Sequence, residues 1–176
     1  MTVNSYTLLK QKEIIQILDG DMTFGELPCE NTSINDVFGF PSYVNISMPS
    51  LTANEICDIS TRFGFPMKVV GNKSRRQYFE DMLDNLIQSD RCSELLAFLF
   101  DKSQFTRQLS DFPSKTSDEY YNLIIEKVLE RINNILHFSG HKLTISNKKF
   151  FVQPIKIKLE AQNVCSHPKS DMISIL

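Results

Sequence analysis

The chain is organised around TSDEYYNLIIEKVLERINNILHFSG (residues 116–140) and HKLTISNKKFFV (residues 141–152), which follows it directly. The first segment has apolar residues at the spacing of one helix face, namely Tyr121, Ile124, Ile125, Val128, Ile132, Ile135 and Leu136. Thr116 and Glu119 have capping-box spacing, and Gly140 suits the left-handed residue that ends a helix. The pattern predicts an amphipathic helix of about 22 residues, roughly 33 Å long, that needs apolar partners.

The second segment has the pattern of a β-hairpin. Residues 143–145 and 150–152 are rich in apolar side chains, and the polar residues 146–149 separate them. Lys148 and Lys149 are therefore expected at the tip. We expect the hairpin to pack back on the helices, because each of its strands has an apolar face to bury.

The upstream segments supply partners for the long helix. Apolar periodicity predicts helices over residues 6–19, 52–63, 74–87 and 93–100, and a further turn or two over 103–109. Gly20 is expected to end the first helix. Two more capping-box pairs, Thr52 with Glu55 and Ser74 with Gln77, mark the starts of the second and third.

Short strands are predicted over residues 43–48 and 67–70, with the second beside the first. Residues 21–41 contain Gly25, Pro28, Gly39 and Pro41, which is typical of an irregular connection. The expected fold is therefore mainly α (α+β): a bundle of about five or six helices around a long C-terminal helix, with a small β-hairpin or short sheet.

Length and composition set further limits. Residues 1–160 are predicted to form one globular domain, and residues 161–176, which lack periodicity, are predicted to form a tail or linker.

The net charge of −2 argues against a protein whose main role is to bind nucleic acid. The four cysteines are widely spaced and no apolar run resembles an export signal or a membrane span. We expect reduced thiols, a cytoplasmic location and no membrane partner.

Arg131 and His137 are the candidate catalytic pair. Ribonucleases of the HEPN class carry an Arg, four to six residues and then a His near the end of a long helix, and five residues separate this pair. A His can move the 2′-hydroxyl proton while an Arg stabilises the developing phosphate charge. The alternative is a solvated Arg and a His that interacts favourably with the helix dipole. Residues six apart also point about 120° away from each other on a helix.

Basic side chains gather in two places that could contact nucleic acid. Lys73, Arg75 and Arg76 precede or begin a predicted helix, where free amides can also hold phosphate. Lys148 and Lys149 lie at the hairpin tip, which resembles a wing lying along a phosphate backbone. The alternative for both clusters is a solvated surface whose charge is matched by acidic residues elsewhere.

The sequence favours no metal site and no cofactor. His137 and His141 have a metal-ligand spacing, but Gly140 ends the helix between them and no third ligand lies nearby. The P-loop, nucleophile-elbow, dinucleotide-binding and HExxH patterns are absent. The residues therefore favour a non-catalytic protein, although an enzyme that uses Arg131 and His137 stays open.

Several segments together resemble the N-terminal domains of bacterial abortive-infection proteins of the AbiJ type, which act in phage defence. They are residues 12–21, 44–51, 55–66, 74–86, 93–100, 132–136, 140–143 and 150–152. The resemblance implies a regulatory or sensing module that controls an effector, often a HEPN-like one, through protein–protein contact. The expected partner is that effector domain or another protein, and self-association into a homo-oligomer is also open. Residues 161–176 would then lead toward an effector that these 176 residues do not include.

Overall fold

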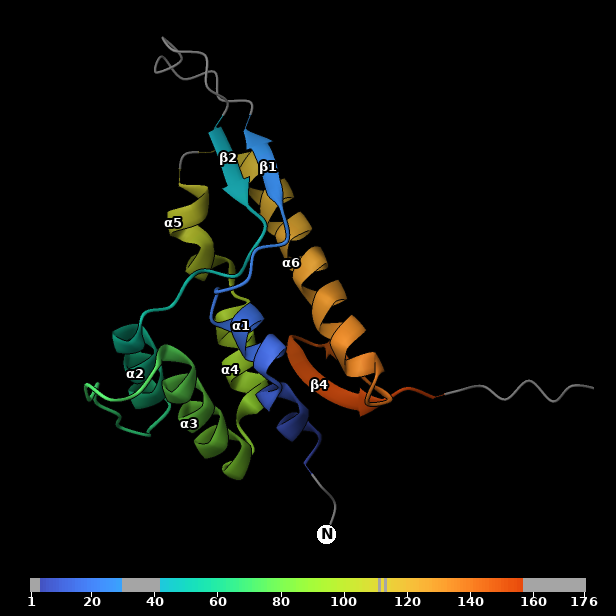
Figure 1. Ribbon diagram of the computed structural model, residues 1–176. Helices are drawn as coiled ribbons and strands as arrows, with labels where there is room; N and C mark the ends of the chain where they lie inside the picture. The colour runs from blue at the N-terminus through green and yellow to red at the C-terminus, as the bar shows by residue number, and fades with distance from the viewer. Residues whose placement is uncertain (1–3, 30–41, 111, 113, 157–176) are drawn as a thin grey trace, which may run out of the picture.

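The structure, a computed structural model, describes residues 4–29, 42–110, 112 and 114–156 (Figure 1). Its elements are η1 (3-10 helix, Ser5–Lys10), α1 (Lys12–Leu18), β1 (Glu26–Cys29), β2 (Ser42–Asn45), α2 (Ala53–Arg62), α3 (Arg75–Gln88), α4 (Cys92–Leu99), η3 (3-10 helix, Lys102–Phe105), α5 (Thr106–Leu109), α6 (Ser114–His137), β3 (His141–Ser146) and β4 (Lys149–Pro154). Over these residues the chain thus has six α-helices and two antiparallel two-stranded sheets. The mainly α prediction is confirmed; the predicted tail, residues 161–176, lies outside the described residues.

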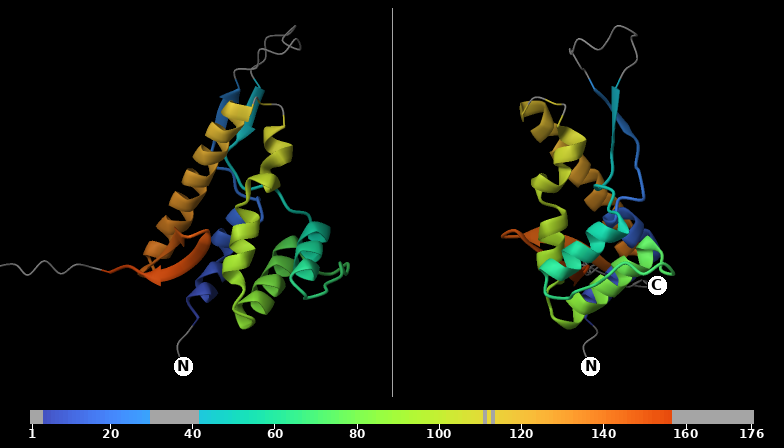
Figure 2. Two further views of the ribbon diagram at one scale, coloured as in Figure 1. Left: turned by 180° about the vertical axis from the view of Figure 1, so that it is seen from behind. Right: turned by 90° about the vertical axis from the view of Figure 1, so that its left-hand side faces the viewer.

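The helix α6 runs along one side of the molecule, with α5 near its first turns and the β3–β4 hairpin at its other end (Figures 1 and 2). Its central stripe is fully buried and repeats every four residues: Ile124, Val128, Ile132 and Leu136. Gly140 has a φ of +67° and its N–H bonds to the carbonyl of His137, so the predicted helix end is confirmed.

The predicted start of α6 is wrong by two residues. The helix begins at Ser114, so Thr116 lies inside the first turn and cannot be its N-cap. Upstream, the ring of Phe112 packs edge-on against Tyr120, with 4.9 Å between ring centroids. This contact packs Phe112 against the second turn of the helix.

The hairpin is confirmed and is longer than predicted. Asn147 and Lys148 both have positive φ, and Ser146 pairs with Lys149, so a two-residue turn joins β3 to β4. On the inner face, Leu143, Phe150 and Val152 are buried. Tyr6 and Ser93 hold β4 from outside the hairpin: Tyr6 Oη donates to the Phe150 carbonyl at 2.5 Å, and the Phe150 N–H donates to Ser93 Oγ at 2.9 Å.

Asn133 holds the free edge of β3 to α6. Its Oδ1 accepts the Leu143 N–H at 2.6 Å, and its Nδ2 donates to the Leu143 carbonyl at 3.2 Å. The side-chain amide therefore satisfies the two backbone groups that a neighbouring strand would otherwise pair.

We predict that Asn133→Ala lowers the free energy of unfolding by about 1–3 kcal/mol, because it leaves two partly buried backbone groups without partners. The matched control is Asn134→Ala, since Asn134 is exposed and its side chain bonds to no described residue. The control should stay within about 0.5 kcal/mol of wild type. Urea unfolding followed by circular dichroism measures both. Equal losses in the two variants would contradict the edge-holding role of Asn133.

The single helix predicted over residues 6–19 is two helices, η1 and α1, separated at Gln11. Gln11 has an extended ψ of 134°, and its Nε2 donates to the Leu8 carbonyl at 3.1 Å. In one continuous helix, Leu9 and Ile14 would point about 140° apart. The break reorients the backbone, and both side chains are fully buried.

The strand predicted over residues 67–70 is also wrong. The partner of β2 is β1, in the segment predicted to be irregular, with Leu27 opposite Val44. Residues 67–70 have no regular structure. Val70 is about half exposed, and its backbone N–H and carbonyl both bond to the Tyr78 hydroxyl at 2.6 Å. The Tyr78 hydroxyl thus satisfies the two Val70 backbone groups that a neighbouring strand would otherwise pair.

Two helix starts were predicted correctly. Thr52 and Glu55 at α2, and Ser74 and Gln77 at α3, form complete capping boxes. Hydrogen bonds from the Thr52 N–H and hydroxyl lower the pKa of Glu55. These local interactions place the first turns of both helices.

The end of α1 is a crowded junction. Gly20 has a φ of +76°, and a Cβ on it would lie 2.4 Å from the Pro49 carbonyl oxygen. Beside it, Asp19 is buried and accepts hydrogen bonds from the Asp21 N–H at 3.0 Å and Arg75 Nε at 3.2 Å. Burial raises the pKa of Asp19, against the lowering effect of these partners. The junction joins α1, α3 and the loop before α2.

Candidate functional site

Arg131 and His137 do not share a pocket. The helix α6 is continuous through His137, so the six-residue step turns one side chain about 120° away from the other. Both side chains are exposed and form no ion pair or hydrogen bond with the part of the chain that the structure describes. Arg131 lines a groove that His137 does not. One copy of the chain therefore does not bring the Arg and the His together on the same face.

The groove beside Arg131 lies between the start of α1 and the last turns of α6. We call it the α6-end groove, and its residues are Gln11, Lys12, Glu13, Arg131, Asn134, Ile135 and Phe138. Its volume is about 420 Å³. The helices α1 and α6 contact each other directly, and the neighbouring Ile14 and Leu136 are fully buried, which gives the groove a packed base.

Phe138 is the exposed apolar side of the α6-end groove. It follows α6 directly and is 93% exposed, whereas the other exposed large hydrophobic side chains among the described residues reach 55% at most. Transfer of a Phe side chain out of water is favourable by about 1.5–3 kcal/mol. A partner that covers the Phe138 ring would gain this free energy.

The charges around Phe138 are not neutralised within the described part of the chain. Lys12, Glu13 and Arg131 line the α6-end groove and form no ion pair there. Two cations against one carboxylate give this groove a net positive charge. The groove therefore combines an uncovered aromatic ring with cations that can attract a carboxylate from another molecule.

Lys73, Arg75 and Arg76 are each engaged in ion pairs. Lys73 Nζ lies 2.6 Å from Asp81, and Arg76 Nε lies 3.0 Å from Glu80. Arg75 bridges the carboxylates of the crowded junction at the end of α1, at 2.6 Å from Asp21. These carboxylates offset the positive charge that would attract a phosphate backbone.

Lys148 and Lys149 lie at the hairpin tip as predicted, and both are exposed. They line a pocket of about 430 Å³ together with Asp90 and Glu94. The pKa of Glu94 is lowered chiefly by its hydrogen bond with Arg91 and to a lesser extent by the charge of Lys149. The tip thus presents cations and carboxylates side by side.

The described thiols are not poised for nucleophilic chemistry. Cys57 and Cys92 are free and buried. Burial, with a smaller contribution from the charge of Asp90, raises the pKa of Cys92 to about 12, and burial also raises the pKa of Cys57. Within the described ranges, no three His, Cys, Asp or Glu residues are grouped so as to hold a metal ion, and no helix there is long and apolar enough to cross a membrane.

Sequence patterns did not single out Phe138 or Lys12. Phe138 lies beyond the last turn of α6, outside the buried four-residue repeat, and its exposure depends on what surrounds the helix end. No protein-family model matches the chain, and searches of curated proteins and of solved structures give no match. The resemblance to AbiJ-type proteins therefore stays a prediction.

Proposed function

We propose that the protein is a non-catalytic interaction module that binds a partner protein through the α6-end groove. The observation that carries the proposal is Phe138, an aromatic side chain almost fully exposed beside Lys12 and Arg131, which have no ion-pair partner among the described residues. In the phage-defence setting that the sequence resemblance implies, the partner is an effector that this contact holds or releases.

The α6-end groove selects for a particular partner chemistry. Phe138 and the half-buried Ile135 favour an apolar side chain, and Lys12 with Arg131 favour carboxylates next to it. The partner segment should therefore be apolar at its centre and acidic at its flanks. Burial of the Phe138 ring would contribute about 1.5–3 kcal/mol, so the groove anchors a contact rather than forming all of it.

The proposal is tested with a phage-displayed library of random peptides selected on the purified chain. We expect enrichment of peptides with an apolar residue flanked by Asp or Glu, and we expect Phe138→Ser to weaken their binding about tenfold or more. Arg131→Glu should weaken it too, through charge reversal. The control is Val70→Ser, which removes an exposed apolar side chain elsewhere and should leave binding unchanged.

Three outcomes would contradict the proposal. One is the absence of any enriched peptide, and another is equal peptide binding by wild type and Phe138→Ser. The third is RNA cleavage by the wild type that disappears in His137→Ala, with unfolding behaviour unchanged, because that result would make the protein a ribonuclease. Sedimentation velocity over a concentration series tests the separate case in which a second copy of the chain covers Phe138; there, Phe138→Ser would abolish self-association.

A further inference from the structure

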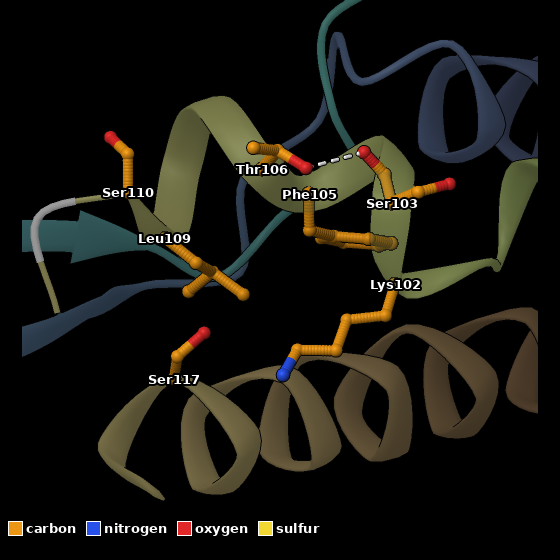
Figure 3. Close-up of a pocket in the computed structure, with 7 residues that line it drawn as sticks. All are labelled: Lys102, Ser103, Phe105, Thr106, Leu109, Ser110 and Ser117. Carbon is orange, nitrogen blue, oxygen red and sulfur yellow. Dashed lines mark hydrogen bonds between the residues drawn. The ribbon is translucent and has the colours of Figure 1, made fainter. Parts of the chain in front are cut away.

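A second pocket lies near the opposite end of α6, between that helix and the η3–α5 segment (Figure 3). Its volume is about 340 Å³. Small-molecule sites commonly span about 300–1,000 Å³, so this pocket suits a small ligand. Its residues come from two segments that are joined through residues 111–113 in sequence and that face each other across the pocket.

Ser117 supplies a polar group that the fold does not use. The residue is only 8% exposed, and its hydroxyl forms no hydrogen bond with the described residues. Figure 3 shows this hydroxyl pointing from α6 into the pocket. The nearby Thr106 hydroxyl, in contrast, donates to the Ser103 carbonyl at 2.7 Å. The Ser117 hydroxyl can therefore donate a hydrogen bond to an acceptor bound in the pocket.

Phe105 and Leu109 supply an apolar wall. Both are buried, and both side chains are directed toward the pocket in Figure 3. The Phe105 ring packs edge-on against Tyr121, with 5.3 Å between ring centroids. Tyr121 is itself held by a hydrogen bond from its hydroxyl to the Phe100 carbonyl at 2.5 Å. The wall is thus preorganised for an apolar ligand body.

Lys102 supplies a cationic donor whose charge Asp118 offsets in part. Its side chain extends from η3 across the pocket toward α6 (Figure 3), where the ammonium pairs with Asp118. An ammonium has three donors, so Lys102 can bond to Asp118 and to a ligand at once. Ser117 lies in the first turn of α6, where the helix dipole also favours a negative group.

We propose that this pocket binds a small organic carboxylate with a compact apolar body. The carboxylate accepts hydrogen bonds from the Ser117 hydroxyl and the Lys102 ammonium, and the apolar body lies against Phe105 and Leu109. The site is separate from the α6-end groove, and it gives the protein a means to bind a metabolite whether or not that groove binds a partner.

The experiment uses ligand-observed NMR titrations of the full chain with benzoate, phenylacetate and isovalerate. Phenylacetamide and benzylamine are the matched neutral and cationic probes. We expect phenylacetate to bind at least tenfold more tightly than phenylacetamide. Ser117→Ala should weaken phenylacetate binding about tenfold, since it removes one hydrogen bond to a charged group. Lys102→Met should weaken it as well.

The variants separate binding from folding. Ser117→Ala removes a hydroxyl that has no partner among the described residues, so its unfolding curve should match that of wild type. Ser146→Ala, at an exposed serine outside the pocket whose hydroxyl bonds to no described residue, should change neither stability nor binding. The proposal is overturned if none of the three carboxylates binds at about 10 mM. It is also overturned if phenylacetamide binds equally well, or if both pocket variants bind phenylacetate like wild type.

Discussion

Replacement of Gly20 by alanine should lower the free energy of unfolding by about 2–5 kcal/mol. Two effects add at this position. The φ of +76° places an L-residue in the left-handed region, which costs about 1–2 kcal/mol. The new Cβ would also lie 2.4 Å from the Pro49 carbonyl oxygen and 2.6 Å from the Ser50 Cα. Both are backbone atoms, so the clash cannot be relieved by a side-chain rotation.

Two other glycines isolate the steric part of this effect. Gly64 and Gly140 have φ values of +89° and +67°, on either side of the Gly20 value, and a Cβ on either would meet no heavy atom within 4 Å. Their alanine variants should lose only the conformational part, about 1–2 kcal/mol. Urea unfolding of the three variants measures the difference. Equal losses of unfolding free energy at all three positions would show that the Pro49 loop does not lie close enough to Gly20 to clash with a Cβ.

The crowding at Gly20 has consequences for neighbouring residues. Relief of the clash must move the loop that contains Pro49, and this loop bonds to the end of α1 through the Leu51 N–H and the Asp19 carbonyl at 2.9 Å. Asp19 in turn contacts Arg75 at the start of α3. We therefore expect Gly20→Ala to loosen the contact between α1 and α3 as well as the loop itself.

Leu136→Ala should lower the free energy of unfolding by about 2–5 kcal/mol. Leu136 is fully buried at the end of the central stripe of α6, one turn after the buried Ile132. Truncation removes apolar contacts and leaves a cavity that surrounding helices can fill only in part. Thermal and urea unfolding measure the loss.

Phe138→Ala is the matched control for Leu136→Ala. The two residues are two positions apart, but Phe138 is 93% exposed. Its removal should therefore change the free energy of unfolding by no more than about 0.5 kcal/mol. The same variant should lose peptide binding, which separates the interaction surface from the core. A loss of stability comparable to that of Leu136→Ala would show that the Phe138 ring is part of the packed fold, and it would remove the basis of the proposed interaction.

Much of the fold could be predicted because its signals are local. The stripe of Ile124, Val128, Ile132 and Leu136 predicts α6, since apolar residues one turn apart share a helix face. The capping boxes of α2 and α3 and the hairpin turn also depend on residues within four positions of each other. Such interactions form between sequence neighbours and are visible in the sequence.

The wrong predictions involve segments that meet only in the folded chain. β2 pairs with β1 rather than with residues 67–70, and the Tyr78 hydroxyl replaces a strand at Val70. The break at Gln11 orients Leu9 and Ile14 toward a core that other helices build. These outcomes depend on long-range packing, which overrides local propensity.

For function, the sequence alone identified the helix that carries Arg131 and His137, the basic residues at α3 and the hairpin tip, and the glycine that ends α1. The tertiary structure decided which side chains are available to bind a partner or a ligand. It placed carboxylates beside Lys73, Arg75 and Arg76 and left Phe138 exposed. It also directed the Ser117 hydroxyl, which bonds to no other described residue, into a pocket (Figure 3). The physical reason is that exposure and hydrogen-bond satisfaction depend on atoms from distant segments, whereas helix formation and capping depend on residues a turn apart.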